Sequence, residues 1–294
     1  MFRLGHVTDP HFRGFSGARP GEFIGKRAIG ALNLVVNRRR KHKMELLEVL
    51  RDDLAAQAVD HLALTGDLSN LSLEGEWREA LRWLAAYGAP AHAVTVIPGN
   101  HDAYVQPVVT ARRFEQMFAA FQGSDVGGGS GYPFVHLRGD VALLGVSSSV
   151  ATGDLGAWGE VGPEQLARLE ALLSGPELRG RTRVVLIHHP PVMQKGIESR
   201  NLRDRAALAS VLARAGAELV IHGHDHRDEQ TAVPGPGGRP IPIVGAGSAS
   251  YAGAAERRAR YNIYEIEGGR ITVVTRAHDE AKGSFREVRR AALS

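Results

Sequence analysis

Short apolar runs alternate with longer amphipathic segments along most of this chain. The short runs are rich in Val, Ile and Leu and predict β-strands. The longer segments repeat their apolar positions every three to four residues, which predicts helices. Strands are predicted at 2–7, 61–65, 93–97, 141–146, 184–187 and 219–222, and helices at 44–57, 73–87, 107–121, 163–173 and 205–215.

The C-terminal part has a different pattern, because strands follow one another without long helices. They are predicted at 241–245, 261–267 and 270–276, and the Gly268-Gly269 pair between the last two is a hairpin signal. No internal repeat is evident. The alternation of strands and helices predicts an α/β fold, which we interpret as one domain over residues 1–294 built around two sheets.

Composition limits the chemistry and the location. With 43% hydrophobic and 23% charged residues, the chain has the composition of a soluble globular protein. It contains no cysteine, which excludes thiol catalysis, Cys-ligated zinc and iron–sulfur clusters. No segment approaches the roughly 18 apolar residues of a membrane-spanning helix, and no apolar leader precedes the first strand. We therefore expect a cytoplasmic protein.

Five short polar motifs interrupt this pattern, and four of them sit just after a predicted strand. Because the carboxyl ends of strands in an α/β sheet lie along one edge, we expect the motifs to meet in one crevice. They are Thr8-Asp9-Pro10-His11, Thr65-Gly66-Asp67, Pro98-Gly99-Asn100-His101-Asp102, Ile187-His188-His189-Pro190-Pro191 and His222-Gly223-His224-Asp225-His226.

Together the motifs offer ligands for metal ions. Carboxylate, amide and imidazole groups in one site suit Mn²⁺, the expected ion, and also Fe²⁺ or Zn²⁺. Seven donors are too many for one tetrahedral ion but natural for two ions that share a carboxylate. Two ions roughly 3.5–4 Å apart clamp the attacking and leaving oxygens of a phosphoryl displacement. The candidate ligands are Asp9, His11, Asp67, Asn100, His188, His224 and His226.

The series Asp-x-His, Gly-Asp, Gly-Asn-His-Asp, His-x-Pro and Gly-His-x-His resembles the calcineurin-like metallophosphoesterase superfamily. The resemblance implies a four-layer α/β/β/α sandwich of two mixed sheets. It also implies hydrolysis of a phosphodiester or pyrophosphate bond. We expect a hydroxide that bridges the two metal ions to be the nucleophile. The implied ligands are Asp9, His11 and His226 for one ion, Asn100, His188 and His224 for the other, and Asp67 as the bridge.

His101 is the candidate catalytic residue besides the metal ligands. Its imidazole, next to Asn100, could protonate the leaving oxygen or stabilise the phosphoryl charge. Asp102 is a candidate to orient that ring, although an aspartate here can equally cap a turn. His189 either touches substrate or packs, and His222 is interpreted as a buried strand-end residue. The other histidines fit no motif and are interpreted as structural or surface residues: His6, His42, His61, His92, His136 and His278.

Several neighbouring classes are disfavoured. Purple acid phosphatases, one branch of the superfamily, place an iron-binding tyrosine three residues after the bridging aspartate, where this chain has Asn70. Branches that became non-catalytic binding scaffolds lack some ligands or the catalytic histidine, whereas this chain keeps them. A nuclease that binds single strands would interleave aromatic and basic residues, and here the basic residues form one local cluster. A nucleic-acid partner is therefore not expected.

Residues 21–43 form a basic and apolar insertion at a point where a short connection would suffice. The first 50 residues contain ten basic and four acidic residues, a local charge of +6, against −2 for the remainder. An apolar segment rimmed with basic residues can lie in a membrane interface or cover an acyl chain. A packing helix with a solvated basic end is the alternative.

Within the insertion, a Gly-Lys-Arg-x-x-Gly-x-x-Asn stretch at 25–33 is followed by Arg-Arg-Arg at 38–40. This pattern resembles an insertion in certain bacterial members of the superfamily, one group of which is similar to the UDP-2,3-diacylglucosamine pyrophosphatases of lipid A synthesis. Those enzymes act on a lipid-bearing nucleotide sugar at the inner membrane face. The better-known branch of that activity carries arginine in place of His101, whereas the cyclic-nucleotide phosphodiesterases carry the Gly-Asn-His found here. The resemblance implies a phosphate-ester substrate, either nucleotide-like or a lipid-linked nucleotide, with peripheral membrane contact through 21–43.

Overall fold

Two six-stranded sheets form the centre of the molecule. The computed structural model describes residues 1–127, 131–153, 156–193 and 198–293. The first sheet has the order β12 (Ser284–Ala292), β11 (Arg270–Asp279), β10 (Arg260–Glu267), β1 (Phe2–Val7), β2 (His61–Thr65) and β3 (Val94–Ile97). The second has the order β4 (Phe134–Arg138), β5 (Val141–Gly145), β6 (Thr182–Leu186), β7 (Leu219–His222), β9 (Pro240–Gly245) and β8 (Glu229–Pro234).

Both sheets are mixed. In the first, β1, β2 and β3 run parallel, and β10 joins β1 antiparallel. In the second, β5, β6, β7 and β9 run parallel, while β4 and β8 pair antiparallel at the two edges. The register places Val7 beside Leu64 and Leu64 beside Val96. The loops that follow these strands therefore begin at the same edge of the sheet.

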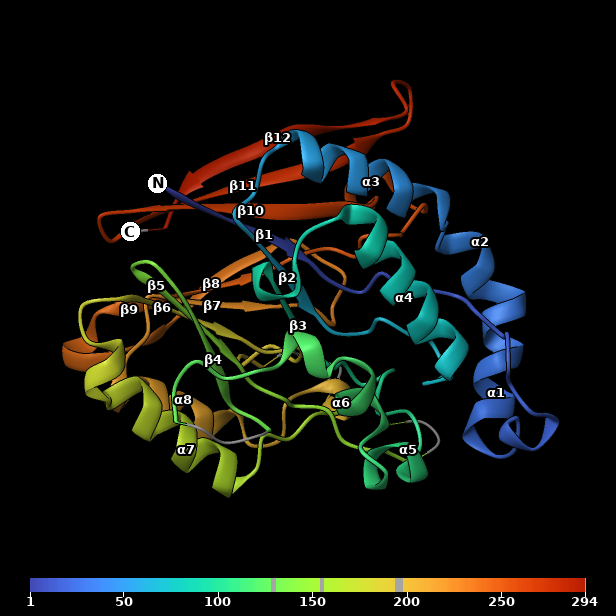
Figure 1. Ribbon diagram of the computed structural model, residues 1–294, viewed down its shortest axis with the longest axis horizontal. Coiled ribbons are helices and arrows are strands. Elements are labelled where there is room, and N and C mark those ends of the chain that lie inside the picture. Colours follow the sequence, from blue (N-terminus) through green and yellow to red (C-terminus); the bar gives the residue numbers. More distant parts are fainter. Residues whose placement is uncertain (128–130, 154–155, 194–197, 294) are drawn as a thin grey trace.

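Helices cover the outer face of each sheet (Figure 1). α3 (Glu45–Ala56) and α4 (Glu74–Tyr87) lie over the first sheet, and α7 (Pro163–Ser174) and α8 (Arg205–Ala215) lie over the second. This arrangement confirms the four-layer α/β/β/α sandwich. Shorter helical segments are α5 (Gln106–Thr110), α6 (Arg113–Met117) and the 3-10 turns Pro20–Glu22, Ala91–Ala93, Ala119–Phe121, Pro176–Leu178, Glu198–Arg200, Pro236–Gly238 and Ala255–Arg257.

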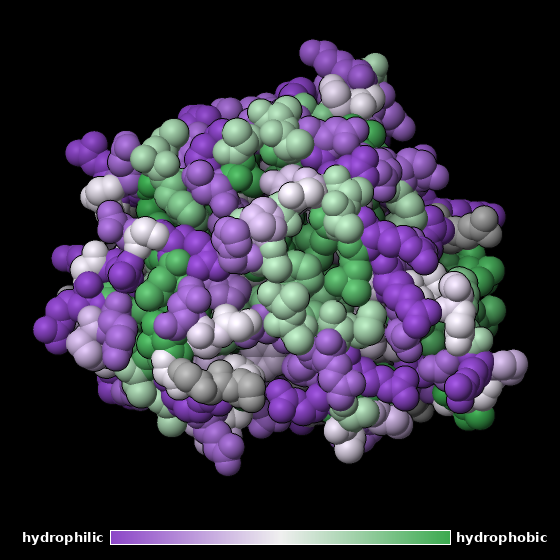
Figure 2. Space-filling view, viewed as in Figure 1, coloured by the Kyte–Doolittle hydropathy of each residue, from purple (hydrophilic) through white to green (hydrophobic). Residues whose placement is uncertain are grey.

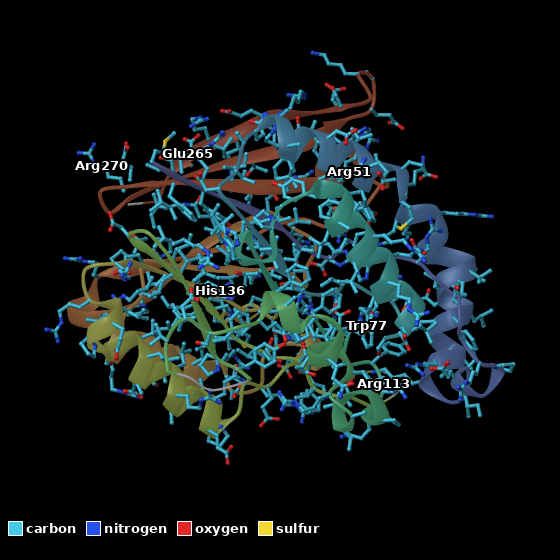
Figure 3. All side chains as sticks on the ribbon, viewed as in Figure 1. Arg51, Trp77, Arg113, His136, Glu265 and Arg270 are labelled. Carbon is cyan, nitrogen blue, oxygen red and sulfur yellow. The ribbon has the colours of Figure 1, made fainter. Side chains whose placement is uncertain are left out.

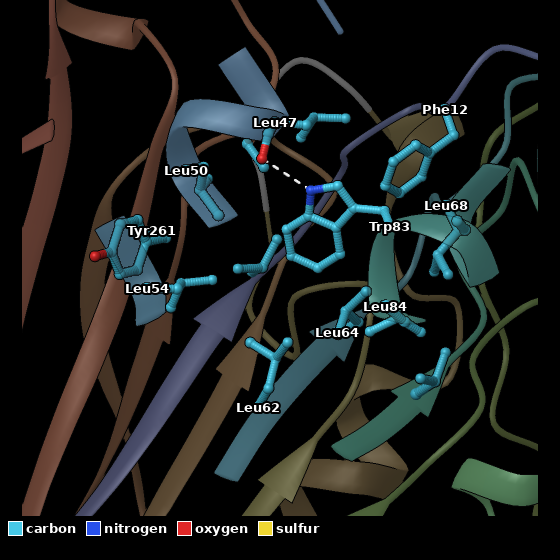
Figure 4. Packing of buried hydrophobic residues seen from close by; sticks show 14 of the residues in the cluster. Phe12, Leu47, Leu50, Leu54, Leu62, Leu64, Leu68, Trp83, Leu84 and Tyr261 are labelled. Carbon is cyan, nitrogen blue, oxygen red and sulfur yellow. Dashed lines mark hydrogen bonds between the residues drawn. The ribbon is translucent and has the colours of Figure 1, made fainter. Parts of the chain in front are cut away.

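Apolar side chains fill the spaces between the layers. Under α3 and α4, Trp83 packs close to Leu62, and its Nε1 donates a hydrogen bond of 2.8 Å to the carbonyl oxygen of Leu47 (Figure 4). Between the sheets, Leu4 of β1 and Val184 of β6 belong to one buried cluster. Burial of a side chain of this kind contributes roughly 1.5–3 kcal/mol, so the layers hold each other in place.

Polar side chains also lie between the sheets. His136, which Figure 3 shows in the interior, shares the Thr95 hydroxyl with His61. Nδ1 of His136 and Nε2 of His61 each lie 2.7 Å from Thr95 Oγ1. Burial lowers the pKa of His61 to about 2 and the pKa of His136 to about 4. Both rings are therefore neutral hydrogen-bonding partners inside the fold.

The sequence prediction omits three strands and joins two short helices into one. β4, β8 and β12 all lie at sheet edges, and β8 and β12 are largely exposed and polar, so their apolar signal is weak. The helix predicted at 107–121 is wrong, because the chain breaks between α5 and α6. Arg112 at the break has a left-handed φ of 49°, which an α-helix cannot contain.

The insertion is helical and lies away from the two chain ends, near the end of the sheets that holds the motif loops (Figure 1). It contains α1 (Lys26–Asn33), a π-helical stretch (Leu34–Arg38) and α2 (Arg39–Lys41). Leu34 is buried against Leu71 and Leu73, which attaches the insertion to the loop before α4.

The outer face of the insertion is apolar and basic. It carries five of the nine exposed large hydrophobic side chains in the described part of the chain, and green atoms mark the margin over α1 in Figure 2. Arg40, Lys41 and Lys43 are exposed, whereas the side chains of Arg38 and Arg39 lie outside the described residues. None of the helices in the described ranges has both the length and the apolar character needed to cross a bilayer. The five apolar residues are Ile24, Ile29, Leu32, Val35 and Val36.

Candidate metal centre

The motif loops meet at one edge of the two sheets, as their positions after strands predict. The backbone N–H of Asp9, after β1, donates a hydrogen bond of 3.1 Å to the carbonyl oxygen of Gly66, after β2. The N–H of Gly223, after β7, donates one of 3.1 Å to the carbonyl oxygen of His188, after β6. Across the two sheets, the backbone N–H of His224 donates a hydrogen bond of 3.0 Å to Oδ2 of Asp9, which brings candidate ligands from both sheets into one crevice.

Four side chains form the first cluster of candidate ligands. One ligand atom from each of Asp9, His11, Asp67 and His226 lies within 4.8 Å of all the others. The Nε2 atoms of His11 and His226 are 3.3 Å apart, and Nε2 of His226 is 3.0 Å from Oδ1 of Asp9. Two carboxylates and two imidazoles at these separations could hold a divalent transition-metal ion.

Asn100, His188 and His224 form the second cluster. Oδ1 of Asn100 lies 2.9 Å from Nδ1 of His224 and 3.3 Å from Nε2 of His188. Asp67 lies between the clusters, with Oδ1 at 3.5 Å from Nε2 of His188 and Oδ2 at 3.9 Å from Nε2 of His11. One oxygen of Asp67 therefore faces each cluster, so this carboxylate could bridge two ions.

Hydrogen bonds from the surrounding loops orient two of the histidines. Nδ1 of His188 lies 2.7 Å from the carbonyl oxygen of Thr65, and Nδ1 of His11 lies 3.2 Å from that of Ser69. Metal-binding histidines usually donate one ring N–H to such an acceptor, which fixes the tautomer and directs the other nitrogen to the ion. Both histidines are arranged for binding through Nε2.

The backbone of the candidate ligands is held in an uncommon conformation. Eight non-glycine residues of the described chain have a φ between 49° and 73°. Such left-handed conformations cost free energy in residues with a Cβ, and their concentration in one crevice is typical of a functional site. Five of the eight are candidate ligands: Asp9, His11, Asp67, His224 and His226.

Two glycines allow the loops to approach one another. A Cβ on Gly223 would lie 1.9 Å from Oγ1 of Thr8 and 2.6 Å from Oδ2 of Asp9. The Thr8 hydroxyl donates a hydrogen bond of 2.7 Å to that same Oδ2, so a side chain at position 223 would displace a candidate ligand. A Cβ on Gly99 would lie 2.3 Å from Oδ1 of Asp67. The glycines of the motifs are therefore required by the packing of the crevice.

The protonation states fit metal binding. Burial alone would raise the pKa of Asp9, but His226 and His188 nearby and the hydrogen bonds from His226 and Thr8 together hold the pKa of this carboxyl below its usual range. Burial lowers the pKa of His224 well below its usual value, and the nearby His189 and His188 lower it further. Ionised carboxylates and neutral imidazoles are the forms that bind metal ions. The donor set thus fits the dinuclear centre that the motifs predict.

His101 lies beside both clusters. Its ring centroid is 5.1 Å from that of His11, and its backbone N–H donates a hydrogen bond of 2.7 Å to Oδ1 of Asp67. Nδ1 of the ring lies 2.7 Å from the carbonyl oxygen of Asn70, and the ring stacks on Tyr104 with a centroid separation of 5.5 Å. The ring is therefore fixed beside the candidate ligands.

A family comparison agrees with this geometry. The family model of the calcineurin-like phosphoesterases matches residues 2–228. The chain belongs to this family. It is a metal-dependent phosphoesterase, and the family uses a dinuclear centre of divalent ions. The resemblance seen in the sequence motifs is confirmed.

Solved structures support the fold of this phosphoesterase. It superposes on a dimetal phosphatase from Danio rerio with a TM-score of 0.63, at 14% identity and with 98% of each chain covered. A purple acid phosphatase from yellow lupin (Lupinus luteus) seeds gives a TM-score of 0.60 at 12% identity, covering 97% of this chain and 52% of that one. No curated protein matches the sequence. At these identities the likeness concerns the fold alone.

Asp102 organises the turns of the phosphoesterase and does not orient His101 as the sequence analysis expected. The ring of His101 bonds to the carbonyl of Asn70, whereas Asp102 is buried and its bonds go to the neighbouring loops. The turn-capping alternative therefore describes Asp102. Its donors, at 2.8–3.0 Å, are the backbone N–H groups of Leu68, Ser69 and Gly99, the Ser69 hydroxyl and Nε1 of Trp77.

The two remaining motif histidines are buried in the loops. Nδ1 of His189 lies 2.8 Å from Oγ of Ser148, and Nε2 lies 3.2 Å from the carbonyl oxygen of Ala157. His222 is buried at the end of β7, and burial lowers its pKa to about 4. These contacts favour packing for His189 over substrate contact.

His42, which the sequence analysis interpreted as a structural or surface residue, lies beside the first cluster. Its ring centroid lies 4.9 Å from that of His11 and 5.6 Å from that of His226. The motifs gave no sign of this position. His42 belongs to no motif and stands at the end of the insertion, so only its place directly before a predicted helix could have drawn notice.

The insertion also contacts the loop beside His101. Arg27 is buried and donates from Nε to the carbonyl oxygen of Leu71 at 2.9 Å and from Nη2 to that of Ser72 at 2.7 Å. Nζ of Lys26 lies 4.5 Å from the centroid of Tyr104, a cation–π contact. Two positive side chains of the insertion thus lie near the catalytic crevice.

A cavity of about 1070 Å³ lies elsewhere in the molecule. Its lining includes Met1, Asp60 and Thr182, which stand at the starts of β1, β2 and β6. The candidate ligands follow the other ends of these strands, so this cavity belongs to the opposite edge of the sheets.

Proposed function

We propose that this phosphoesterase hydrolyses phosphodiester or pyrophosphate bonds with the help of two divalent ions. The observation that carries the proposal is the position of Asp67, whose two carboxylate oxygens face two separate clusters of donors at 3.5 Å and 3.9 Å. We assign Asp9, His11 and His226 to one ion, Asn100, His188 and His224 to the other, and Asp67 to both.

The side chains around the clusters have separate roles in this reaction. When bound, two such ions neutralise phosphate charge and lower the pKa of a water molecule. His101, held through Nδ1 by the carbonyl of Asn70, carries a proton on each ring nitrogen before the reaction. It gives the proton on Nε2 to the leaving oxygen as the bond from that oxygen to phosphorus breaks, which leaves a neutral imidazole. Lys26, over the ring of Tyr104, adds positive charge that attracts an anionic substrate.

The donor set favours a transition metal, and we assign Mn²⁺. Four imidazoles, two carboxylates and one amide oxygen make a mixed set of nitrogen and oxygen donors. Such a set suits Mn²⁺, Fe²⁺ and Zn²⁺ better than Mg²⁺, which prefers oxygen donors alone. Measuring the metal content of the protein as isolated, by mass spectrometry, separates these ions.

Hydrolysis of bis(p-nitrophenyl) phosphate in Mn²⁺ tests the reaction. We expect turnover by the wild type and a loss of more than about 100-fold in Asp67→Asn, which keeps the shape of the side chain but not its charge. The control is His92→Ala, an exposed histidine in the turn before β3, at the opposite end of that strand from the Asn100 motif, and it should match the wild type. Equal turnover by Asp67→Asn and wild type would overturn the proposal.

A lipid-linked nucleotide is a second candidate substrate, favoured by the outer face of the insertion. Ile24 and Leu32 are 73% and 67% exposed, and Arg40 and Lys41 are exposed beside this apolar face. Exposed apolar side chains next to basic ones bind the interface of an anionic membrane, since burial and charge attraction act together. We therefore place the protein in the cytoplasm, with peripheral contact at the inner membrane face.

Release of UMP from UDP-2,3-diacylglucosamine in detergent and Mn²⁺ tests the lipid candidate. Turnover well above that of bis(p-nitrophenyl) phosphate would support it, and Leu32→Glu should then lower turnover of the lipid substrate while sparing the generic diester. Hydrolysis of the generic diester alone would discard the lipid candidate and direct the search to soluble nucleotides, including cyclic nucleotides.

A further inference from the structure

The insertion brings His42 to the first cluster of candidate ligands. One ring nitrogen from each of His11, His42 and His226 lies within 4.8 Å of the other two. His42 is 5% exposed, and its ring meets that of His11 edge-on at an interplanar angle of 78°. Three imidazoles therefore converge on one point at the edge of the crevice.

The hydrogen bond of His42 follows the pattern of the ligands. Its Nδ1 lies 2.9 Å from Oγ of Ser250, just as Nδ1 of His11 and of His188 each meet an oxygen of the surrounding loops. In metal sites a hydrogen bond at one ring nitrogen orients the imidazole so that the other nitrogen can face the ion. The Ser250 hydroxyl can accept the proton of Nδ1 of His42, which leaves Nε2 unprotonated and able to bind a metal ion.

The backbone around His42 is fixed to the loop that supports Asp9. His42 forms a β-bridge with Tyr251, and the N–H of Lys43 donates a hydrogen bond of 2.9 Å to the carbonyl oxygen of Ser250. Oγ of Ser248 in the same loop donates one of 2.7 Å to the carbonyl oxygen of Asp9. The position of His42 relative to the first cluster is therefore set by several bonds.

The group of His11, His42 and His226 shares two residues with the group of Asp9, His11, Asp67 and His226. We propose that His42 is a further imidazole ligand, bound through Nε2, of the ion held by the two shared histidines. The proposal rests on the dinuclear centre proposed above. The 21–43 segment then supplies part of the metal site, in addition to its exposed apolar face. A third imidazole ligand raises the affinity of this site for ions that favour nitrogen donors, such as Fe²⁺, Zn²⁺ and Co²⁺, relative to its affinity for Mg²⁺.

Metal titration of the apoprotein tests this ligand without a measurement of activity. Binding of Mn²⁺ is followed by electron paramagnetic resonance, and binding of Co²⁺ by its visible absorption. We expect two ions per wild-type chain, and in His42→Ala one unchanged site with the other weakened about 10- to 100-fold. The Co²⁺ spectrum of His42→Ala should change as well, because one nitrogen donor is lost, and added imidazole should partly restore it.

Two variants control for folding. His42→Gln keeps much of the bulk and can still bond to Ser250, so it should fold and show the same weakened site. His92→Ala should bind both ions as the wild type does. Two ions bound by His42→Ala and His42→Gln with wild-type affinity and spectrum would overturn the role of His42 alone. A wild type that binds neither metal ion would overturn the dinuclear centre itself.

Discussion

The ligand crevice and the insertion differ in how closely each side chain is constrained. In the crevice, Asp9, Asp67 and His188 are buried, their loops are joined by backbone bonds, and glycine is required where the loops meet. In the insertion, Arg27 and Leu34 make buried contacts, while five large apolar side chains face solvent. The crevice specifies one chemistry, whereas the outer face of the insertion is suited to selecting a partner or substrate.

The loop before α4 joins these two regions. On one side, the carbonyl oxygen of Asn70 holds the ring of His101. On the other side, Arg27 of the insertion donates to the carbonyl oxygens of Leu71 and Ser72. A change in either region can therefore reach the other through the backbone of residues 70–72.

Removal of metal should have the largest effect, because every assigned role in the crevice depends on the ions. A chelator is expected to lower turnover of bis(p-nitrophenyl) phosphate by more than about 1,000-fold, since metal ions supply several kcal/mol of transition-state stabilisation. The melting temperature should fall as well, because the candidate ligands come from both sheets. Added Mn²⁺ should restore both quantities, and full turnover by the chelated protein would contradict the metal mechanism.

The His101→Ala variant should have the next largest effect and should separate proton transfer from metal binding. Loss of a general acid lowers kcat by about 100- to 10,000-fold. The number of bound Mn²⁺ ions should stay the same, because His101 is not an assigned ligand. A variant that loses metal together with activity would instead place His101 among the residues that hold the ions.

That the candidate ligands lie together could be predicted from sequence, because each of them is a particular chemical group close after a strand. The glycines beside them are also part of the sequence motifs. Gly99 and Gly223 stand where two loops touch and where no Cβ fits. The central strands could be predicted to within a residue or two, because β1, β2 and β3 consist largely of buried apolar residues. For both the motifs and the central strands, residues close together in the sequence determine the structure.

The rest of the site could not be predicted, because contacts between distant segments create it. His42 acquires its position from Ser250 and Tyr251, which are far away in sequence. The partner of the His101 ring is the backbone carbonyl of Asn70, a group that any residue would supply. The edge strand β12 carries exposed arginines in place of an apolar face, so composition did not reveal it.

Two alanine substitutions sharpen the comparison between crevice and insertion. In Gly223→Ala, the new Cβ would lie 2.6 Å from Oδ2 of Asp9, so that carboxylate must move. We expect a loss of about 10- to 100-fold in turnover or metal affinity, as for other residues that support ligands. Gly21→Ala, at the start of the insertion, meets no atom within 4 Å and should leave turnover of bis(p-nitrophenyl) phosphate unchanged. Equal losses of turnover in the two variants would show that side chains in the crevice are no more closely constrained than those in the insertion.

A pH-dependent effect on stability tests the loop that joins the two regions. Glu76 of α4 is fully buried and accepts hydrogen bonds from the backbone N–H groups of Asn70, Leu71 and Leu73. Burial raises its pKa from 4.5 to about 7, against the effect of these bonds. Between these values the folded chain keeps a proton that the unfolded chain has lost. The free energy of unfolding should therefore fall as pH rises from about 4.5 to about 7.

Comparison of the wild type with Glu76→Gln isolates this contribution. The amide side chain of the variant would stay neutral at every pH, so the stability of the wild type relative to the variant should decline by an amount on the order of 3 kcal/mol across this window and then stay level. Urea denaturation at several pH values measures it. Glu74→Gln, on the exposed side of the same helical turn, is the matched control and should show no such decline. A constant difference between the wild type and Glu76→Gln would mean that Glu76 is ionised in the folded protein and holds residues 70–73 as a charged acceptor.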